Sequence, residues 1–493
     1  MNTLTLDRPV TDGLVEAPFS GLPDEVVAQA EYIMKNDDAA ASSSASSSND
    51  EKNALDKNIT AKWLLKFALP TIASSVAMTA FGMVDGIFAA RIISPQALAV
   101  VNLVFPMVTF VMAVGFMLAT GGMALVSKQL GEGKGAAARA NFTMLALITL
   151  GVSVVLSAIG ILFPNLVLSI LGVDASLHAL ATEYMQPLLI VFPAAIVGFY
   201  LNQFFIAAGK PTLAMVASLA GGLVNISLNF LLIAHLQMGL RGAALATGLG
   251  YTVPAIIGAV YFARNRQGSL YFVKPTWNWS VFVKSATNGA SEMVTMLAMS
   301  ITAVVMNNIL VRLVGYEGVA AAGIMFVGQG LLVGILMGYS SGIAPIISFN
   351  YGALNRERLQ QIFRLSLVII AIASALAIVA GWFLASPLTV VYVPRSTEIY
   401  RMAVNAFRIG LIGFLFTGFN MFASTLFTAL NNGKVSALLS FFRTLVFILL
   451  MLSLLPGIMG LDGVWYALPA AELLALGTSI WFVAKRRRHY GYA

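Results

Sequence analysis

Twelve apolar stretches of about 20 residues or more recur along this chain between short polar loops. A helix of about 20 apolar residues has the length needed to cross the hydrocarbon core of a bilayer. Because that core offers no water to unpaired backbone groups, such a stretch must form its hydrogen bonds internally, as a helix does. We therefore predict an all-α membrane protein with spans at residues 63–90, 97–124, 142–168, 184–208, 212–236, 243–263, 283–312, 319–345, 362–390, 402–430, 435–458 and 464–484.

Charged residues are too few to give the chain a water-facing exterior. They make up 10% of the 493 residues, while 59% are hydrophobic, and a soluble domain carries about 25% charged residues. The chain has no cysteine and only three scattered histidines, which excludes thiolate metal sites and iron–sulfur clusters. We therefore expect no cofactor and no enzymatic activity. We also expect no nucleic-acid partner, since basic loops of a membrane protein account for the net charge of +8.

The first 58 residues differ from the rest of the chain. They hold eleven of the 21 acidic residues and a serine-rich run at 40–50. A polar, low-complexity segment buries too little apolar surface to fold. We predict a disordered, acidic cytoplasmic tail over residues 1–58.

The positions of Lys and Arg between the predicted spans predict the orientation. With the N-terminus inside, the inner segments hold 20 Lys and Arg and the outer loops hold five. Cytoplasmic loops carry the excess of positive charge in membrane proteins. We expect a multi-pass protein of the bacterial inner membrane with both termini in the cytoplasm, acting as a monomer surrounded by lipid.

An internal repeat appears when the sequence is shifted by 221 residues. Gly121 then matches Gly342, Gly131 matches Gly352, and the motif M-G-L-x-G at 238–242 recurs at 459–463. Six spans separate matched positions, so the two halves share one orientation and are related by an axis along the membrane normal. We predict two six-helix lobes, at residues 59–268 and 269–493, flanking a central cleft.

Five short motifs are spread over both halves of the chain. They are M-V-D-G-I-F (83–88), A-L-A-V-V-N-L-V-F-P (97–106), A-L-V-S-K-Q-L-G-E-G-K (124–134), A-A-G-K-P-T-L-A-M (207–215) and M-G-L-D-G-V-W (459–465). Together they resemble motifs of the MATE (multidrug and toxic compound extrusion) transporters, nearest to the bacterial DinF-like and MepA-like branch, and the resemblance covers residues 59–485. It implies export of small organic molecules and drugs, many of them cations, by antiport against H⁺ or Na⁺ with alternating access between two lobes.

Three carboxylates lie inside predicted spans, namely Asp85, Glu292 and Glu472. An ionised side chain in the bilayer centre costs about 2.5–3.5 kcal/mol on insertion scales, so each is a functional candidate. Asp85 lies about 9 Å inside the outer end of the first span, where it can exchange a proton for a cation. The alternatives are a static ion pair with Arg91 and an aspartate that reaches the outer membrane–water interface.

The resemblance implies a polar cluster around Asp85 in the N-terminal lobe. In this chain the residues at the corresponding positions are Asn202, Asn225, Asn229 and Thr247. Where the family often has N-x-x-x-D, this chain has an amide at Asn229, which supplies a neutral oxygen and cannot release a proton. A Na⁺ site at Asp85, Asn225, Asn229 and Thr247 stays possible. Alternatively, the amides only tie the helices together.

Glu292 lies about 12 Å from the cytoplasmic end of the seventh span. The resemblance implies a cation-coupling role here, although relatives often add an aspartate where this chain has Asn420. The alternative is that Glu292 reaches toward Lys284. Glu472 differs from both other carboxylates because Arg443 on the preceding span lies at similar depth, and we predict a structural ion pair between them.

Pro70 is predicted to act as a hinge in the first span. A proline removes one backbone hydrogen bond and kinks a helix, and the matched position in the second half is Ser291. A hinge in one lobe alone suggests that this lobe bends during transport.

The alternative function is flipping of lipid-linked oligosaccharides by a member of the same superfamily. Such a flippase needs a basic cleft to hold pyrophosphate. Apart from four basic residues within three positions of a span boundary, the basic residues inside the predicted spans are Arg408 and Arg443, both expected near helix ends. Drug export is therefore the favoured interpretation.

We expect deletion of residues 1–50 to leave membrane yield and efflux within about twofold of the full chain, because the tail offers no apolar core. Yield can be measured by fluorescence of a fused reporter and efflux with ethidium. Loss of efflux at normal yield would show that the tail has a function.

Overall fold

The computed structural model describes Leu55, residues 59–88 and residues 95–492, without the side chains of 83–88, 95–99 and 102. Apart from Leu55, the predicted tail at residues 1–58 thus lies outside the described residues. Ala54–Ala493 form one compact unit, and only this unit is considered below.

Within the described residues, twelve helices are long and apolar enough to cross a membrane, and each overlaps one predicted span. The first six are formed by α2 (Ala61–Phe88), α3 (Pro95–Gly131), α4 (Gly135–Leu162), α6 (His178–Ala207), α7 (Pro211–Leu228) with the π-helical turn η3 (Asn229–His235), and α8 (Gly239–Arg264). The short α5 (Pro164–Ile170) and η2 (Ala175–Leu177) connect α4 to α6.

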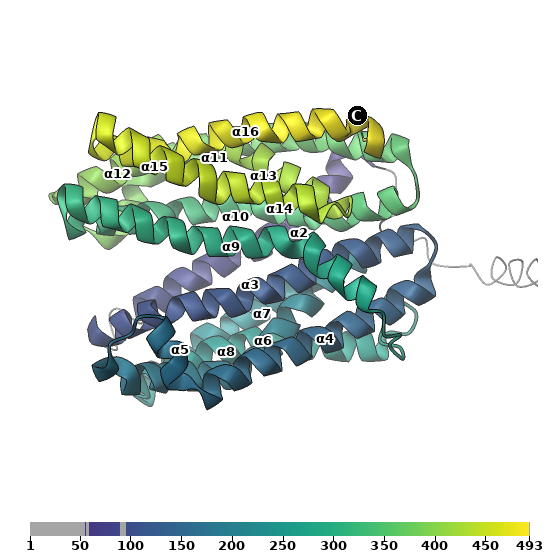
Figure 1. Ribbon diagram of the computed structural model, residues 1–493, viewed down its shortest axis with the longest axis horizontal. Coiled ribbons are helices and arrows are strands. Elements are labelled where there is room, and N and C mark those ends of the chain that lie inside the picture. The colour runs from purple at the N-terminus through teal and green to yellow at the C-terminus, as the bar shows by residue number, and fades with distance from the viewer. Residues whose placement is uncertain (1–54, 56–58, 89–94, 493) are drawn as a thin grey trace, which may run out of the picture. The chain divides into compact units, whose positions relative to one another are not determined.

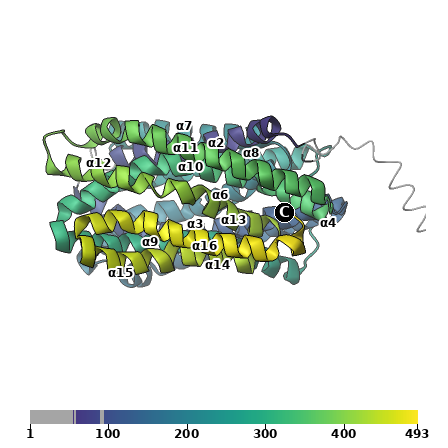
Figure 2. The same ribbon diagram turned by 90° about the horizontal axis from the view of Figure 1, so that it is seen from above.

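The second six helices repeat this order. They are α9 (Trp279–Val314), α10 (Tyr316–Gly352), α11 (Arg356–Tyr392), the pair α12 (Glu398–Leu411) and α13 (Phe414–Ala429), then α14 (Gly433–Phe441) with the π-helical turn η4 (Phe442–Val446) and α15 (Phe447–Met459), and α16 (Leu461–Tyr490). In Figure 1 the helices of the second half of the chain lie above those of the first half, and in the view from above in Figure 2 they lie in front of them. The predicted fold class is confirmed.

Helix starts coincide with polar residues of the loops. At several of them a side-chain oxygen accepts a hydrogen bond from a backbone N–H of the first helical turn, which satisfies a group that has no partner within the helix. Capping residues of this kind include Asn278 before α9, Asn355 before α11, Thr397 before α12 and Asn432 before α14. The loops thus define the ends of helices whose middles are mostly apolar.

Two helices related by the repeat, α7 and α14, each run into a π-helical turn, η3 and η4. Such turns occur most often at functional sites. By contrast, α2 continues as an α-helix through Pro70. The residue after this proline, Thr71, places its hydroxyl 2.8 Å from the carbonyl oxygen of Gly338 on α10, so α2 is tied to the other lobe beside the predicted hinge.

The lobes meet where α3 packs against α9 and α10, and where α2 packs against α10. Near the ends of α3 and α10 the two backbones touch. A Cβ on Gly131 would overlap the carbonyl oxygen of Phe349, and a Cβ on Gly352 would overlap that of Lys128. The shift of 221 relates both glycines and both carbonyls, so one contact is made twice around the axis of the repeat. Only glycine permits so close an approach.

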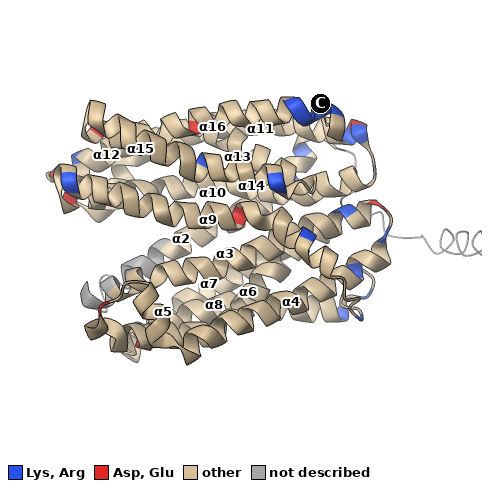
Figure 3. Cartoon of the chain, viewed as in Figure 1, with Lys and Arg blue, Asp and Glu red and all other residues tan. Residues whose placement is uncertain are grey.

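Lys and Arg gather toward the end of the helices at which the C-terminus lies (Figure 3). The Gly131 and Gly352 contacts belong to the same end, because Lys128 and Lys134 flank Gly131. This is the end that the sequence predicts to be cytoplasmic.

We expect Gly131→Ala and Gly352→Ala each to destabilise the protein by about 1–3 kcal/mol, because the added methyl group overpacks a backbone contact. Thermal unfolding in detergent measures this. Gly151→Ala on α4 is the matched control, since no atom lies within 4 Å of a Cβ added there. Equal unfolding temperatures for all three variants would contradict the contact.

Candidate functional site

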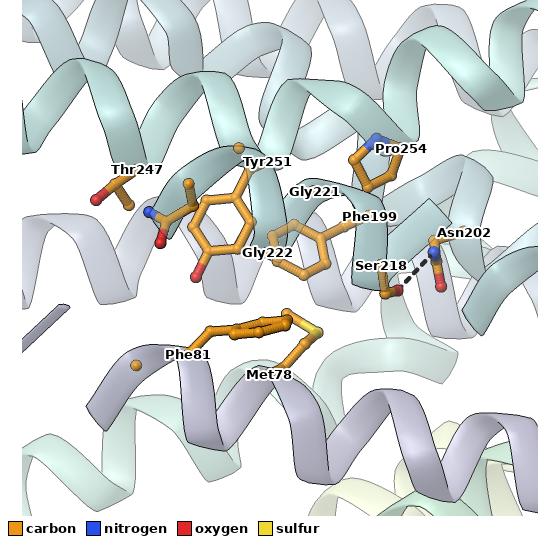
Figure 4. Close-up of a pocket in the computed structure, with 14 residues that line it drawn as sticks. Met78, Phe81, Phe199, Asn202, Ser218, Gly221, Gly222, Thr247, Tyr251 and Pro254 are labelled. Atoms are coloured by element: carbon orange, nitrogen blue, oxygen red, sulfur yellow. Dashed lines mark hydrogen bonds between the residues drawn. The ribbon is translucent and has the colours of Figure 1, made fainter. Parts of the chain in front are cut away.

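A pocket lies inside the N-terminal lobe, between α2, α6, α7 and α8 (Figure 4). It is therefore not at the interface between the lobes, where the sequence places the binding cleft. Its lining combines five glycines, the polar residues Asn202, Ser218, Asn225 and Thr247, and the apolar or aromatic residues Met78, Phe81, Phe199, Tyr251 and Pro254. No charged side chain lines it among the side chains that the structure describes.

The polar side of the pocket is held in place by hydrogen bonds. Asn202 donates from Nδ2 to the carbonyl oxygen of Ala214 and to Oγ of Ser218, each at 3.0 Å. Asn229 donates from Nδ2 to Oδ1 of Asn225 at 3.3 Å. The amide groups are thus oriented before any ligand arrives, and they join α6 to α7 as well as lining the pocket.

The structure brings together most of the residues expected around the first-span carboxylate. Asn202, Asn225 and Thr247 line one pocket, and Asn229 joins them through its bond to Asn225. The side chain of Asp85 and the whole of Arg91 lie outside the described residues. Their predicted roles are therefore neither supported nor opposed by the geometry.

The aromatic residues of the pocket are the part that the sequence did not single out. The ring of Phe81 lies over Gly222, where even a Cβ would overlap it. On the facing side, the rings of Phe199 and Tyr251 have centroids 5.2 Å apart. The sequence does contain one indication that Tyr251 belongs to the site. Tyr251 follows the predicted cluster residue Thr247 by four positions, and residues four apart lie on the same face of a helix.

The pocket is narrow in this conformation. Its cavity volume is about 60 Å³, enough for a few water molecules, whereas pockets for drug-sized ligands measure about 300–1,000 Å³. Because Phe81 is the residue of α2 that lies against α7, a larger ligand requires this ring or α2 itself to move away.

In the C-terminal lobe, Arg443 on η4 and Glu472 on α16 form an ion pair in which two guanidinium nitrogens contact the carboxylate. Nη2 of Arg443 lies 2.8 Å from Oε1 of Glu472, and Nε lies 2.9 Å from Oε1 and 3.1 Å from Oε2. Asn420 on α13 donates to Oε2 at 2.7 Å and accepts a bond from Ser479 at 2.9 Å. Both side chains of the pair are mostly buried, with 16% and 15% exposed.

Glu292 is half-buried on α9. Lys284, the alternative partner, is exposed, and the ion pairs of the described residues join Glu292 neither to Lys284 nor to Arg443. The ionisable cluster that the geometry shows in this lobe is thus the Arg443–Glu472 pair with Asn420.

The repeat relates this cluster to the N-terminal pocket. At the shift of 221, Arg443 corresponds to Gly222 and Glu472 to Tyr251, both of which line the pocket. Asn420 corresponds to Phe199. The same place between matched helices therefore holds an ion pair in one lobe and a neutral pocket in the other.

The expected position of Arg443 near a helix end is wrong, because Arg443 lies well inside the span Gly433–Met459. Arg408 lies in the last turn of α12, at the end of a helix as predicted. Both side chains have neighbours that stabilise their charge. Glu472 pairs with Arg443, and the guanidinium of Arg408 lies 4.5 Å from the centre of the Trp382 ring, an arrangement in which the aromatic face attracts the cation.

We expect Gly222→Ala to destabilise the protein by about 1–3 kcal/mol, since the new methyl group displaces the Phe81 ring. Gly82→Ala is the control, because Gly82 also lines the pocket but has no atom within 4 Å of an added Cβ. Thermal unfolding of the two variants in detergent separates them. Identical midpoints would show that Phe81 does not rest on Gly222.

Known proteins share this sequence pattern and fold. The family model MatE matches residues 70–231 and 292–452. The multidrug export protein MepA of Staphylococcus aureus is 24% identical over 430 residues, which cover 85% of this chain and 92% of MepA.

Among solved structures, a MATE transporter in complex with MaD3S superimposes with a TM-score of 0.84 at 20% identity, covering 90% of this chain and 100% of that one. An outward-facing multidrug resistance MATE transporter gives 0.83 at 21% identity, covering 90% and 99%. Because the family model matches more than half of the sequence, this chain belongs to the MatE family of membrane transporters.

Proposed function

We propose that the protein exports organic, mostly cationic, drugs from the cell in exchange for H⁺ or Na⁺, and that the N-terminal pocket is its drug site. The pocket's neutral, aromatic lining carries this proposal. Aromatic faces attract organic cations by about 0.5–2 kcal/mol without fixing a single orientation, and Met78 adds a flexible side chain that adapts to different shapes. The similarity to MepA, a multidrug export protein, supports this substrate class.

Asp85 is the proposed coupling carboxylate of this lobe. It follows Phe81 by four residues on α2, so the two positions share a helix face, and Phe81 lines the pocket. A carboxylate at this position is neutralised either by a proton or by the cationic drug, and the two then compete. That competition would exchange one for the other across the membrane.

The identity of the coupling ion depends on how many oxygens surround Asp85. A proton needs only the carboxylate, whereas Na⁺ needs several further oxygens, and Asn225, Asn229 and Thr247 are the candidates to supply them. In the structure the Oδ1 of Asn225 already accepts a bond from Asn229 at 3.3 Å. A Na⁺ ion would use the second lone pair of that oxygen, so this bond is compatible with either ion and the gradient experiment below identifies the driving ion.

Alternating access is proposed to involve bending of α2 at Pro70. Thr71 donates a hydrogen bond to the carbonyl oxygen of Gly338 on α10, so a movement of α2 would change the packing at the interface between the lobes. Because Phe81 belongs to the same helix, bending would also widen or close the narrow pocket. Both termini would face the cytoplasm, with the protein in the inner membrane.

Flipping of a lipid-linked oligosaccharide is the second candidate. A pyrophosphate group requires cationic side chains at its binding site. Among the described residues, the pocket lining contains none, and Arg443 is engaged by Glu472. These observations favour drug export.

The decisive test is Asp85→Asn, which retains the size of the side chain and removes its charge. We expect normal membrane yield, ethidium binding within several-fold of wild type, and efflux at background under an imposed pH or Na⁺ gradient, because nothing in this lobe would change charge between the two states. Glu292→Gln should impair efflux separately, and Asn229→Ala should be milder than either.

Each gradient is applied alone to proteoliposomes, so that the driving ion is identified in the same experiment. Ethidium export by Asp85→Asn at the wild-type rate would remove Asp85 as the coupling group and leave Glu292 as the candidate.

A further inference from the structure

We propose that a groove between the first turns of α6 and α8 binds a phospholipid whose headgroup carries both a phosphate and a primary ammonium group, as that of phosphatidylethanolamine does. The groove shares no residue with the N-terminal pocket. The proposal goes beyond the proposed export activity and does not depend on it.

The groove is large enough for a lipid headgroup and is open to the surroundings of the protein. Its volume is about 350 Å³, within the range of sites for drug-sized ligands. The side chain of Arg241 is 64% exposed, and Ile190 is 67% exposed. The lining includes Glu183, Gln186, Pro187 and Ile190 of α6 together with Arg241 and Leu245 of α8.

The surroundings of the groove are apolar. Leu249, Ile256 and Val260 follow Leu245 on the same face of α8, and they are 39–60% exposed. The neighbours against which α8 packs most closely, α6, α7 and η3, belong to its own lobe. An exposed apolar face on a membrane-spanning helix is suited to contact with acyl chains. A lipid is therefore the molecule that meets the groove from this side.

The groove presents one charge of each sign. Nε of Arg241 lies 3.3 Å from Oε1 of Glu183. A guanidinium has five N–H donors and can bind two phosphate oxygens in parallel, while a carboxylate can accept several hydrogen bonds at once. A phosphate placed against Arg241 and an ammonium placed against Glu183 would thus match the groove in charge and in hydrogen bonding.

The order of polar and apolar residues along the helices is that of a phospholipid. Both helices begin at the end of the protein opposite to Lys134 and Lys210, since these lysines precede the starts of α4 and α7. At 1.5 Å per residue, Leu245 lies about 6 Å deeper than Arg241, and Ile190 lies about 10 Å deeper than Glu183. With the proposed orientation, the headgroup site belongs to the outer leaflet.

The second lobe shows that helix packing does not require an arginine at this place. At the shift of 221, Arg241 corresponds to Asp462 and Glu183 to Val404. There, Asn405 donates from Nδ2 to Oδ1 of Asp462 at 3.0 Å and joins α12 to α16. The starts of the matched helices are thus connected without a cation, and Arg241 is an addition of the first lobe.

The test measures binding of three phospholipids with identical acyl chains to the purified full chain in detergent, by native mass spectrometry. We expect phosphatidylethanolamine to bind at least fivefold more tightly than phosphatidylcholine or phosphatidylglycerol. The choline group has no N–H to donate to Glu183, and the glycerol headgroup has no cation.

Substitutions separate the two charges. Arg241→Gln should weaken phosphatidylethanolamine binding at least tenfold, and Glu183→Gln should bring the three lipids within twofold of one another. Arg401→Gln is the matched control, since it removes an arginine from an exposed ion pair made within α12 alone, and lipid binding should not change. Exposed ion pairs contribute little to stability, so all three variants should unfold at the wild-type temperature.

Ile190→Ser provides the test if Arg241→Gln fails to fold. It keeps both charges and removes apolar contact, so we expect binding of each lipid to weaken at least threefold while the preference among them is kept.

Three results would overturn the inference. Equal binding of the three lipids by the wild-type protein would show that lipid only surrounds the helices. Unchanged phosphatidylethanolamine binding by both Arg241→Gln and Ile190→Ser would place the lipid elsewhere. Full displacement of the lipid by a tenfold excess of glycerophosphoethanolamine, which has no acyl chains, would show a site for a soluble ligand. These readouts involve no transport, so they leave the export proposal to its own test.

Discussion

An ionised side chain in the hydrocarbon core of a membrane needs a compensating charge or a hydrogen-bonded shell, and this requirement explains the polar groups of the protein. Most Lys and Arg lie toward one end of the helices (Figure 3). Deep in the C-terminal lobe, Arg443 meets Glu472 through two nitrogens. In the N-terminal pocket the described polar residues are amides and hydroxyls, which bind each other. Arg443 and Glu472 therefore meet this requirement by pairing, and the described lining of the pocket meets it by containing no charge.

The two lobes show how one helical arrangement can serve two purposes. Repeat-related helices enclose a neutral pocket in the first lobe and an ion-pair cluster in the second. The difference is clearest at one repeat-related position. In the first lobe it is Gly222, which leaves room for the Phe81 ring, and in the second it is Arg443, which places a guanidinium group there. A duplicated fold has thus diverged in side chains while its backbone stayed alike.

The sequence predicts the twelve spans well because the thickness of a bilayer dictates their length, and the repeat is evident from matched glycines such as Gly131 and Gly352. Family resemblance also identifies Asn202, Asn225 and Thr247 as neighbours. Phe81 and Tyr251 escape detection because aromatic residues are common throughout the spans. The depth of Arg443, and the bond by which Asn420 holds Glu472 in place, depend on how α13, α14 and α16 pack, which no local pattern contains.

The paired contacts of Gly131 with Phe349 and of Gly352 with Lys128 have a mechanical consequence. Symmetry about an axis along the membrane normal puts both points at one depth, so the line through them lies in the plane of the membrane. Farther along α3 the lobes are equally close, because a Cβ on Gly121 would overlap the carbonyl oxygen of Ser285 and a Cβ on Gly289 would overlap that of Met117. A rotation of the lobes about the line would keep the first two contacts and break these two, so the packing of α3 against α9 opposes any separation of the far ends of the lobes.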